Sequence, residues 1–189
     1  MTWEQPHAES QLVRAAQAGD AEAFAALYER YVDRLYRYIY YRVGNRTEAE
    51  DLTEQVFLKA WEAIRRYEER GVPFGAWLFR LAHNLVIDHY RTTRPTQSLE
   101  ATGGPTPADP DRLLSLRLEL ADLQQALARL PEEQQAVIIL RFLEGLSHQE
   151  VARLLGKSEG AVRVIQHRAL AALARLLGGV RNRGNIEAH

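Results

Sequence analysis

Apolar residues in this 189-residue chain recur three or four positions apart, which is the spacing of one face of an α-helix. The longest such run comprises Phe24, Leu27, Tyr28, Tyr31, Leu35 and Ile39. The chain has neither a sustained alternation of polar and apolar residues nor an Asn-Gly or Asp-Gly hairpin dipeptide. We therefore predict an all-α fold.

Capping signals predict three helices in the first half of the chain. Asp20 can cap the first helix, and Gly44 ends it. Thr47 and Glu50 have the spacing of a capping box, which predicts a second helix from there to about residue 67. Pro73 stands where a third helix should begin, and that helix should run to about residue 91.

Three further helices are predicted in the second half. Pro131 starts one of them and Gly145 stops it. Ser147 and Glu150 form another capping box, and Ser158 caps the last long helix.

A stretch of glycine, proline and small polar residues, TQSLEATGGPTPAD at 96–109, interrupts the helical pattern. This composition buries too little apolar surface to offset ordering of the backbone, and it is typical of a flexible linker. We predict two small helical domains joined by it. The predicted parts are an N-terminal tail (1–9), a first domain (10–95), a flexible linker (96–115), a second domain (116–177) and a C-terminal tail (178–189).

The composition excludes several classes of function. Basic residues number 24 and acidic residues 25, and this balance excludes a protein that coats nucleic acid through its total charge. The absence of cysteine excludes disulfides, thiol catalysis and cysteine-ligated metals. No apolar run approaches the roughly 20 residues that span a bilayer, and the N-terminus lacks the pattern of a secretory signal. We expect a cytoplasmic protein without membrane insertion.

The segment from Ser147 to Leu173 has the pattern of a helix-turn-helix. Ala152 is small where the two helices should cross, and Gly156 supplies the tight turn. Lys157 departs from the pattern, because an apolar residue is usual directly after this glycine. A plain helical hairpin with a solvated basic face is the alternative.

The last helix should present an outward face that suits the major groove of DNA. At about 100° per residue, this face carries Gly160, Arg163, Val164 and His167, with Arg168 at its flank. Arginine can bond guanine, while small or apolar residues allow close approach and contact thymine methyl groups. The N-terminal end of the same helix favours a phosphate.

A second candidate face lies on the helix predicted from Thr47. Asp51, Glu54, Gln55 and Leu58 share a narrow stripe with Glu62, opposite the residues that should pack inward. An exposed leucine within an acidic rim suggests a surface for a basic protein partner. A plain solvated face is the alternative.

The third candidate face lies on the helix around residues 74–91. Phe79, His83, Ile87 and Tyr90 form an apolar and aromatic stripe behind the expected core stripe. The polar residues Arg80, Asn84 and Arg91 edge this stripe. Aromatics interleaved with arginine suit stacking on unpaired bases. A helix wedged between two neighbours, with both stripes buried, is the alternative.

No catalytic or metal site is expected. His83, Asp88 and His89 lack the spacing of metal ligands, and neither a phosphate-binding loop nor a nucleophile elbow occurs. Glu132 and Glu133 at a helix start are explained by the helix dipole. We expect no cofactor.

Four segments, in this order, resemble the bacterial extracytoplasmic-function (ECF) sigma factors, the promoter-specificity subunits of RNA polymerase. The segments are AEDLTEQVFLKAW (Ala49 to Trp61), FGAWLFRLAHNLVIDHYR (Phe74 to Arg91), LPEEQQAVIILRFLEGLSHQEVA (Leu130 to Ala152) and the helix-turn-helix. The chain departs from the family at two places. Glu54 and Gln55 occur in the reverse of the usual order, and Ile165 and Gln166 stand where a basic residue and leucine are common.

The resemblance implies a role for each face. The stripe of Asp51, Glu54, Gln55 and Leu58 would bind the coiled coil of the polymerase β′ subunit. The −10 element would be melted and bound as a single strand by Phe79, Arg80, His83, Asn84, Ile87, Asp88, Tyr90 and Arg91. The −35 element would be bound by Ser158, Glu159, Gly160, Arg163, Val164, His167 and Arg168. The second domain would also contact the β flap, and a cognate anti-sigma factor would hold the protein inactive.

Three other functions compete with this interpretation. A stand-alone helix-turn-helix regulator would use the first domain for sensing or dimerisation, but it leaves the acidic stripe without a role. A metal-dependent helical hydrolase lacks the ligand spacing. A purely protein-binding antagonist would not need Arg163 or His167 for promoter choice.

Overall fold

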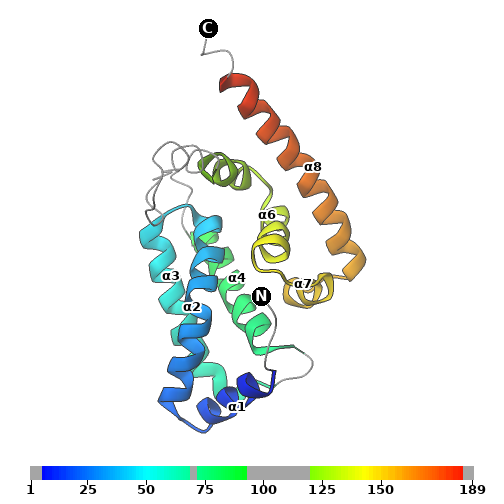
Figure 1. Ribbon diagram of the computed structural model, residues 1–189. Coiled ribbons are helices and arrows are strands. Elements are labelled where there is room, and N and C mark those ends of the chain that lie inside the picture. The colour runs from blue at the N-terminus through cyan, green and yellow to red at the C-terminus, as the bar shows by residue number, and fades with distance from the viewer. Residues whose placement is uncertain (1–5, 69–71, 93–119, 185–189) are drawn as a thin grey trace, which may run out of the picture.

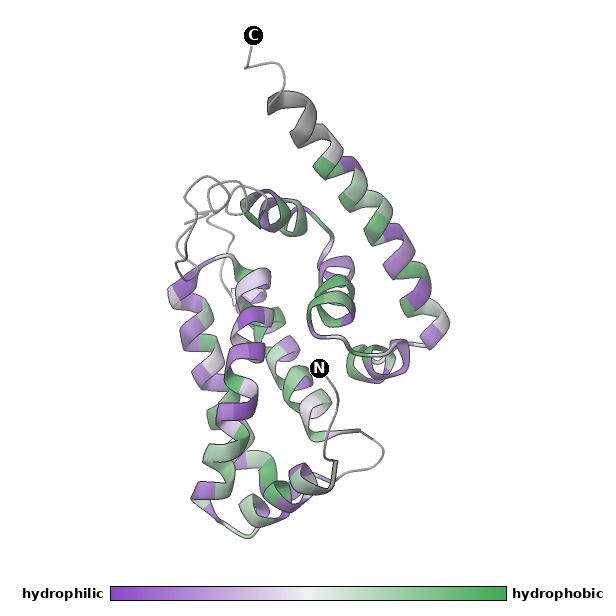
Figure 2. Ribbon diagram, in the orientation of Figure 1, coloured by the Kyte–Doolittle hydropathy of each residue, from purple (hydrophilic) through white to green (hydrophobic). Residues whose placement is uncertain are grey.

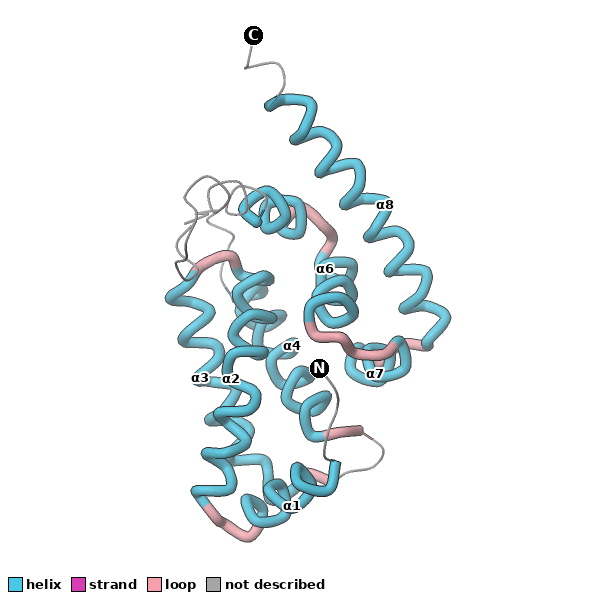
Figure 3. Tube along the Cα trace, in the orientation of Figure 1, coloured by secondary structure: helices cyan, strands magenta, loops and turns pink. Residues whose placement is uncertain are grey.

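The computed structural model describes residues 6–68, 72–92 and 120–184. These residues form helices and connecting loops without a strand, as Figure 3 shows, and the predicted all-α fold is confirmed. The linker predicted at 96–115 lies outside the described residues.

The first domain contains α1 (Pro6–Gln17), α2 (Ala21–Val43), α3 (Arg46–Ala63), a 3-10 turn η1 (Ile64–Arg66) and α4 (Phe74–Thr92). In Figure 1, α2, α3 and α4 run side by side while α1 crosses one end of them. The helix α1 begins at Pro6, within the segment predicted as a tail. It is held because Val13 and Ala16 are buried in the core and because Tyr31 donates a hydrogen bond to Glu9 at 2.8 Å.

Both predicted ends of α2 are confirmed. Asp20 accepts hydrogen bonds from the backbone amides of Glu22 and Ala23, at 2.9 and 3.1 Å. Gly44 adopts the left-handed conformation, with φ +73°, and its amide donates to the Tyr40 carbonyl.

The predicted capping box at Thr47 is wrong. Asn45 caps α3 instead, and its side chain accepts from the Glu48 amide at 3.1 Å. The helix ends at Ala63 rather than near residue 67. Gln17 of α1 explains this end, because its amide donates to the carbonyls of Ile64 and Tyr67 at 3.1 and 2.6 Å.

The second domain contains a helical segment at 120–128, α6 (Glu132–Ile138), a π-helical turn η2 (Ile139–Leu143), α7 (His148–Leu155) and α8 (Glu159–Gly184). The predicted capping box of Ser147 and Glu150 is confirmed, with both of its hydrogen bonds present. The predicted turn at Gly156 is confirmed at φ +65°. The helix α8 continues past the predicted domain end at residue 177.

Two apolar cores hold these helices together. Figure 2 shows hydrophilic and hydrophobic residues interspersed along α3 and α8, as expected for helices that bury one face. The larger core joins the two domains, because Val137, Leu140, Val151 and Leu154 of the second domain share one cluster with the first. The smaller core lies between the segment 120–128, α6 and α8.

Candidate functional site

The outward face of α8 is exposed along its whole predicted length. The exposed residues are Ser158, Glu159, Gly160, Arg163, Val164, His167 and Arg168. Val162 and Ala169 on the opposite side are fully buried, and Ser158 Oγ accepts from the Ala161 amide at 3.1 Å. The helix is therefore anchored by one face and presents the other to solvent.

Two features of this exposed face suit a groove of DNA. A Cβ atom at Gly160 would meet nothing within 4 Å, so packing inside the protein does not require glycine there. Arg163 is paired with Glu159 at 2.5 Å, one turn away. Exposed pairs of this kind contribute about 0–1 kcal/mol, so Arg163 can exchange its partner at little cost.

Polar contacts hold the two residues of the helix-turn-helix that depart from the expected patterns, Lys157 and Gln166. Lys157 forms an ion pair with Glu133 of α6. Gln166 of α8 accepts hydrogen bonds through Oε1 from Arg141 of η2, at 3.2 Å, and from His148 of α7, at 2.9 Å.

The acidic stripe on α3 lies on the surface. Asp51, Glu54 and Gln55 are exposed, and Leu58 is 60% exposed. Leu52, Val56 and Ala60 on the opposite side are buried. Solvation alone would favour a polar residue at the position of Leu58, so its exposure suggests a partner surface.

Sequence reasoning missed two exposed aromatic residues beside this stripe. Tyr28 of α2 packs on Phe57, with ring centroids 4.5 Å apart, and Trp61 packs on Phe24 at 4.9 Å. Tyr28 and Trp61 are 40% and 39% exposed. The periodicity had placed Tyr28 on the inward stripe of its helix, and only the packing of α2 against α3 brings it to this surface.

The eight residues predicted to bind single-stranded DNA differ in how exposed they are. Phe79 is fully buried, 5.6 Å from the Tyr38 ring and 5.4 Å from the Arg34 guanidinium, so it is inaccessible in this structure. His83 and Ile87 are partly buried. Tyr90 is at the margin of exposure and donates a hydrogen bond to the Arg42 carbonyl. The exposed polar edge of α4 consists of Arg80, Asn84, Asp88 and Arg91.

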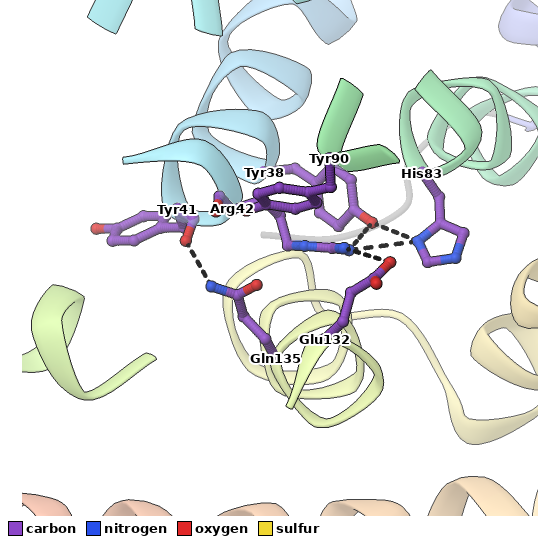
Figure 4. Close-up of polar contacts among 7 residues, drawn as sticks. All are labelled: Tyr38, Tyr41, Arg42, His83, Tyr90, Glu132 and Gln135. Carbon is purple, nitrogen blue, oxygen red and sulfur yellow. Dashed lines mark hydrogen bonds and ion pairs between the residues drawn. The ribbon is translucent and has the colours of Figure 1, made fainter. Parts of the chain in front are cut away.

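Arg42 lies at the centre of a polar cluster between the domains (Figure 4), and nothing in the sequence singled it out. Its side chain is fully buried and donates to the Tyr38 hydroxyl at 3.0 Å and to Glu132 of α6 at 3.2 Å. Gln135 of α6 donates to the carbonyl of Tyr41 at 3.1 Å. Glu132, which the helix dipole alone had explained, is thus also an interdomain contact.

The cluster fixes the protonation of His83. Arg42 can only donate, and its Nη1 lies 3.3 Å from His83 Nδ1, so this nitrogen is unprotonated. The Tyr38 hydroxyl, 3.0 Å away, therefore donates to Nδ1 as well. Burial and the Arg42 charge lower the pKa of His83 to about 4, and burial raises the pKa of Tyr38.

A second polar contact joins the domains at Glu144. Its side chain is fully buried and accepts from Arg34 Nε at 3.0 Å, while Arg34 Nη2 donates to its backbone carbonyl at 3.2 Å. Arg37 lies 3.9 Å away. Burial raises the pKa of Glu144 and outweighs the two arginines, which lower it.

In the described part of the chain, no three His, Asp or Glu side chains are grouped so that they would hold a metal ion. Within the same residues, no helix is long and apolar enough to cross a membrane.

Comparison with known protein families identifies both halves of the chain. The family model of Sigma-70 region 2 matches residues 27–96, and that of Sigma-70, region 4 matches residues 120–173.

Two characterised relatives are similar over most of this chain. ECF RNA polymerase sigma factor BldN of Streptomyces coelicolor is 46% identical over 173 residues, which cover 88% of this chain and 65% of BldN. ECF RNA polymerase sigma factor SigW of Bacillus subtilis is 33% identical over 178 residues, which cover 87% of this chain and 94% of SigW.

Two solved structures have a similar fold. CnrH, solved in complex with the cytosolic domain of CnrY, superimposes with a TM-score of 0.73 at 30% identity, over 91% of this chain and 98% of CnrH. The sigma factor RpoE of Bartonella quintana, solved with the anti-sigma factor NepR, superimposes with a TM-score of 0.70 at 23% identity, over 84% and 98% of the two chains. The second likeness concerns the fold alone.

Proposed function

This chain belongs to the ECF sigma factors of bacterial RNA polymerase. On that premise we propose that each of its exposed helix faces serves a different step of promoter-specific initiation. As a sigma factor it binds core polymerase and promoter DNA. It serves as a specificity subunit without catalytic residues of its own, and it works in the cytoplasm.

The exposed face of α8 would bind the −35 element. The observation that carries this assignment is that all seven predicted residues of this face are exposed while the opposite face is buried. Arg163 and His167 are long enough to reach base edges in the major groove, and Gly160 leaves room for the DNA to approach. The helix-turn-helix docks in this way when its second helix enters the groove.

The stripe of Asp51, Glu54, Gln55 and Leu58 would bind the β′ coiled coil. Leu58 supplies an apolar anchor and the carboxylates supply a rim of opposite charge to a basic partner. Tyr28 and Trp61 extend the apolar part of this surface.

The exposed edge of α4 would make the first contacts with the −10 element. Arg80 and Arg91 can neutralise phosphates, and Asn84 can bond a base. His83 and Phe79 would contact DNA only after the second domain and the neighbouring helices move.

We also propose regulation by a cognate anti-sigma factor. CnrH was solved with the cytosolic domain of CnrY, and RpoE with an anti-sigma factor. The exposed faces described above are the surfaces that such a protein would need to cover.

Run-off transcription with core polymerase on a randomised promoter library tests the proposed function. We expect transcripts from templates that share two sequence elements, and no such transcripts from core enzyme alone. Failure to initiate from any template would refute the assignment.

Polymerase capture tests the stripe separately. Asp51→Arg combined with Leu58→Asp should abolish capture of core enzyme, because it reverses one charge and removes the anchor. Glu29→Arg combined with Leu120→Asp is a matched control, since Glu29 is exposed and Leu120 is 54% exposed outside the stripe. Equal capture by both double variants would contradict the role of the stripe.

A further inference from the structure

Gln166 is the residue on α8 that neither the core nor the outward face explains. At about 100° per residue it lies roughly 60° round the helix from Arg163 and 40° from the buried Val162. It therefore stands where the buried face meets the outward face. Its side chain is partly exposed and belongs to neither the apolar cores nor the predicted DNA contacts.

The neighbours of Gln166 fix the orientation of its amide. The Nε–H of Arg141 has no acceptor capacity, so the atom that it contacts at 3.2 Å must be the amide oxygen. His148 Nε2 contacts the same oxygen at 2.9 Å and must carry a proton to do so. Two donors use both lone pairs of this oxygen, and the NH₂ group is left on the other side.

The locked amide limits what Gln166 can bind. A glutamine that bonds adenine in the major groove uses its oxygen and its nitrogen together. The oxygen of Gln166 is already occupied, so it offers donors only. The fitting partner is an acceptor without donors, and a phosphate oxygen of the DNA backbone has this chemistry.

The position of Gln166, Arg141 and His148 favours a contact with the DNA backbone over a contact with the bases. In a helix-turn-helix the first helix crosses the sugar-phosphate backbone while the second enters the groove. Gln166 contacts His148, the first residue of α7, across the interface of these two helices. Arg141 supplies a positive charge at the same place, and its Nη1 also donates to the Leu146 carbonyl, which holds the loop before α7.

We propose that Gln166, locked by Arg141 and His148, binds one backbone phosphate beside the −35 element and thereby sets the position of α8 in the groove. This inference rests on the proposed function and adds a contact to it. The position of Gln166, where leucine is common in the family, gives this chain a polar contact that a leucine cannot make.

Gln166→Glu separates a DNA contact from a purely structural role. A glutamate keeps an oxygen for Arg141 and His148, so the packing of α8 should hold or strengthen. It replaces the outward NH₂ donors with an oxygen that repels phosphate. A purely structural role predicts unchanged promoter binding, whereas the phosphate contact predicts roughly ten- to hundredfold weaker binding by holoenzyme.

The assay uses holoenzyme and a duplex with the −35 sequence that the wild type selects from the randomised library. We expect the weakening to be similar for all −35 variants, because a phosphate contact carries no base information. Gln11→Glu is the matched control, since it adds the same charge to an exposed position of α1, in the first domain and away from the helix-turn-helix. A loss confined to one base pair would overturn the proposal in favour of base recognition.

Single methylphosphonate substitutions along the −35 duplex locate the contact. Each replaces one charged phosphate oxygen with a methyl group. Wild-type holoenzyme should lose affinity at each phosphate that it contacts, and Gln166→Glu should fail to respond to substitution at one of them, as expected for two changes at one contact. Equal responses of both proteins at every phosphate would refute the contact. If wild-type holoenzyme selects no promoter at all, the proposed function itself fails.

Discussion

His83 should make the stability of the first domain depend on pH. Its pKa is about 4 in the folded chain, because it is buried and faces the Arg42 guanidinium, with Glu133 as a weaker opposing charge. The ordinary pKa is 6.5, so between these values the unfolded chain binds more protons than the folded chain. The stabilisation is complete above pH 6.5 and is lost as the pH falls toward 4.

The two pKa values set the magnitude. Lowering the pH from 7 to 5 should reduce the free energy of unfolding by about 2 kcal/mol through His83 alone. Urea unfolding followed by tryptophan fluorescence measures this loss. The three tryptophans, at positions 3, 61 and 77, all precede the predicted linker, so the signal reports on the first domain.

His83→Asn is the comparison that tests the reasoning. Its side-chain oxygen can accept from Tyr38 and Arg42 in place of Nδ1, but asparagine does not titrate. The variant should lose about 2 kcal/mol less than the wild type between pH 7 and 5. The exposed His167→Asn is the control and should behave as the wild type. Identical pH dependence in all three proteins would refute the argument.

Three further predictions concern packing, the domain contact and the recognition helix. Gly75→Ala should lower the free energy of unfolding by about 1–3 kcal/mol in a urea titration, because its Cβ would lie 2.7 Å from the Tyr31 hydroxyl; unchanged stability would show that Tyr31 can move aside. Arg34→Glu should place two carboxylates together at the domain contact, so the domains should separate and the radius of gyration of the protein in X-ray scattering should increase. Adding Glu144→Arg should restore an ion pair and reverse the increase. Equal radii of gyration of the single and the double variant would exclude this pair as a domain contact. Gly160→Ala should stabilise α8 by up to about 1 kcal/mol, because the added methyl group meets open space within the protein. The same methyl group should weaken promoter binding by holoenzyme, because it stands where the DNA approaches. Unimpaired binding would show that DNA does not approach α8 at this position.

Features that depend on neighbouring residues in the sequence were predicted well. The caps at Asp20 and Ser147 and the turns at Gly44 and Gly156 are confirmed, since each is decided by residues within four positions. The cap of α3 was wrong because Thr47 and Glu50 have the right spacing but Asn45, directly after the turn, takes that role.

Features that depend on distant segments could not be predicted. The end of α3 is decided by Gln17, which lies more than 40 residues away in the chain. The burial of Phe79 follows from its contact with α2, and the periodicity of α4 allowed either a buried or an exposed second stripe. Arg42 gave no signal, because a buried arginine is recognisable only when its partners on other helices are known.

Lys157, which departs from the helix-turn-helix pattern, and Gln166, which departs from the family pattern, have a common physical consequence. Lys157, in the turn between α7 and α8, and Gln166, on α8, are polar where apolar residues are usual, and each is held by a polar partner on another element. Two of these partners, Glu133 and Arg141, precede the helix-turn-helix and lie on α6 and η2. The geometry of α8 in this chain therefore depends on α6 and η2 through directional contacts, and the second domain should position its recognition helix only as a unit that includes them.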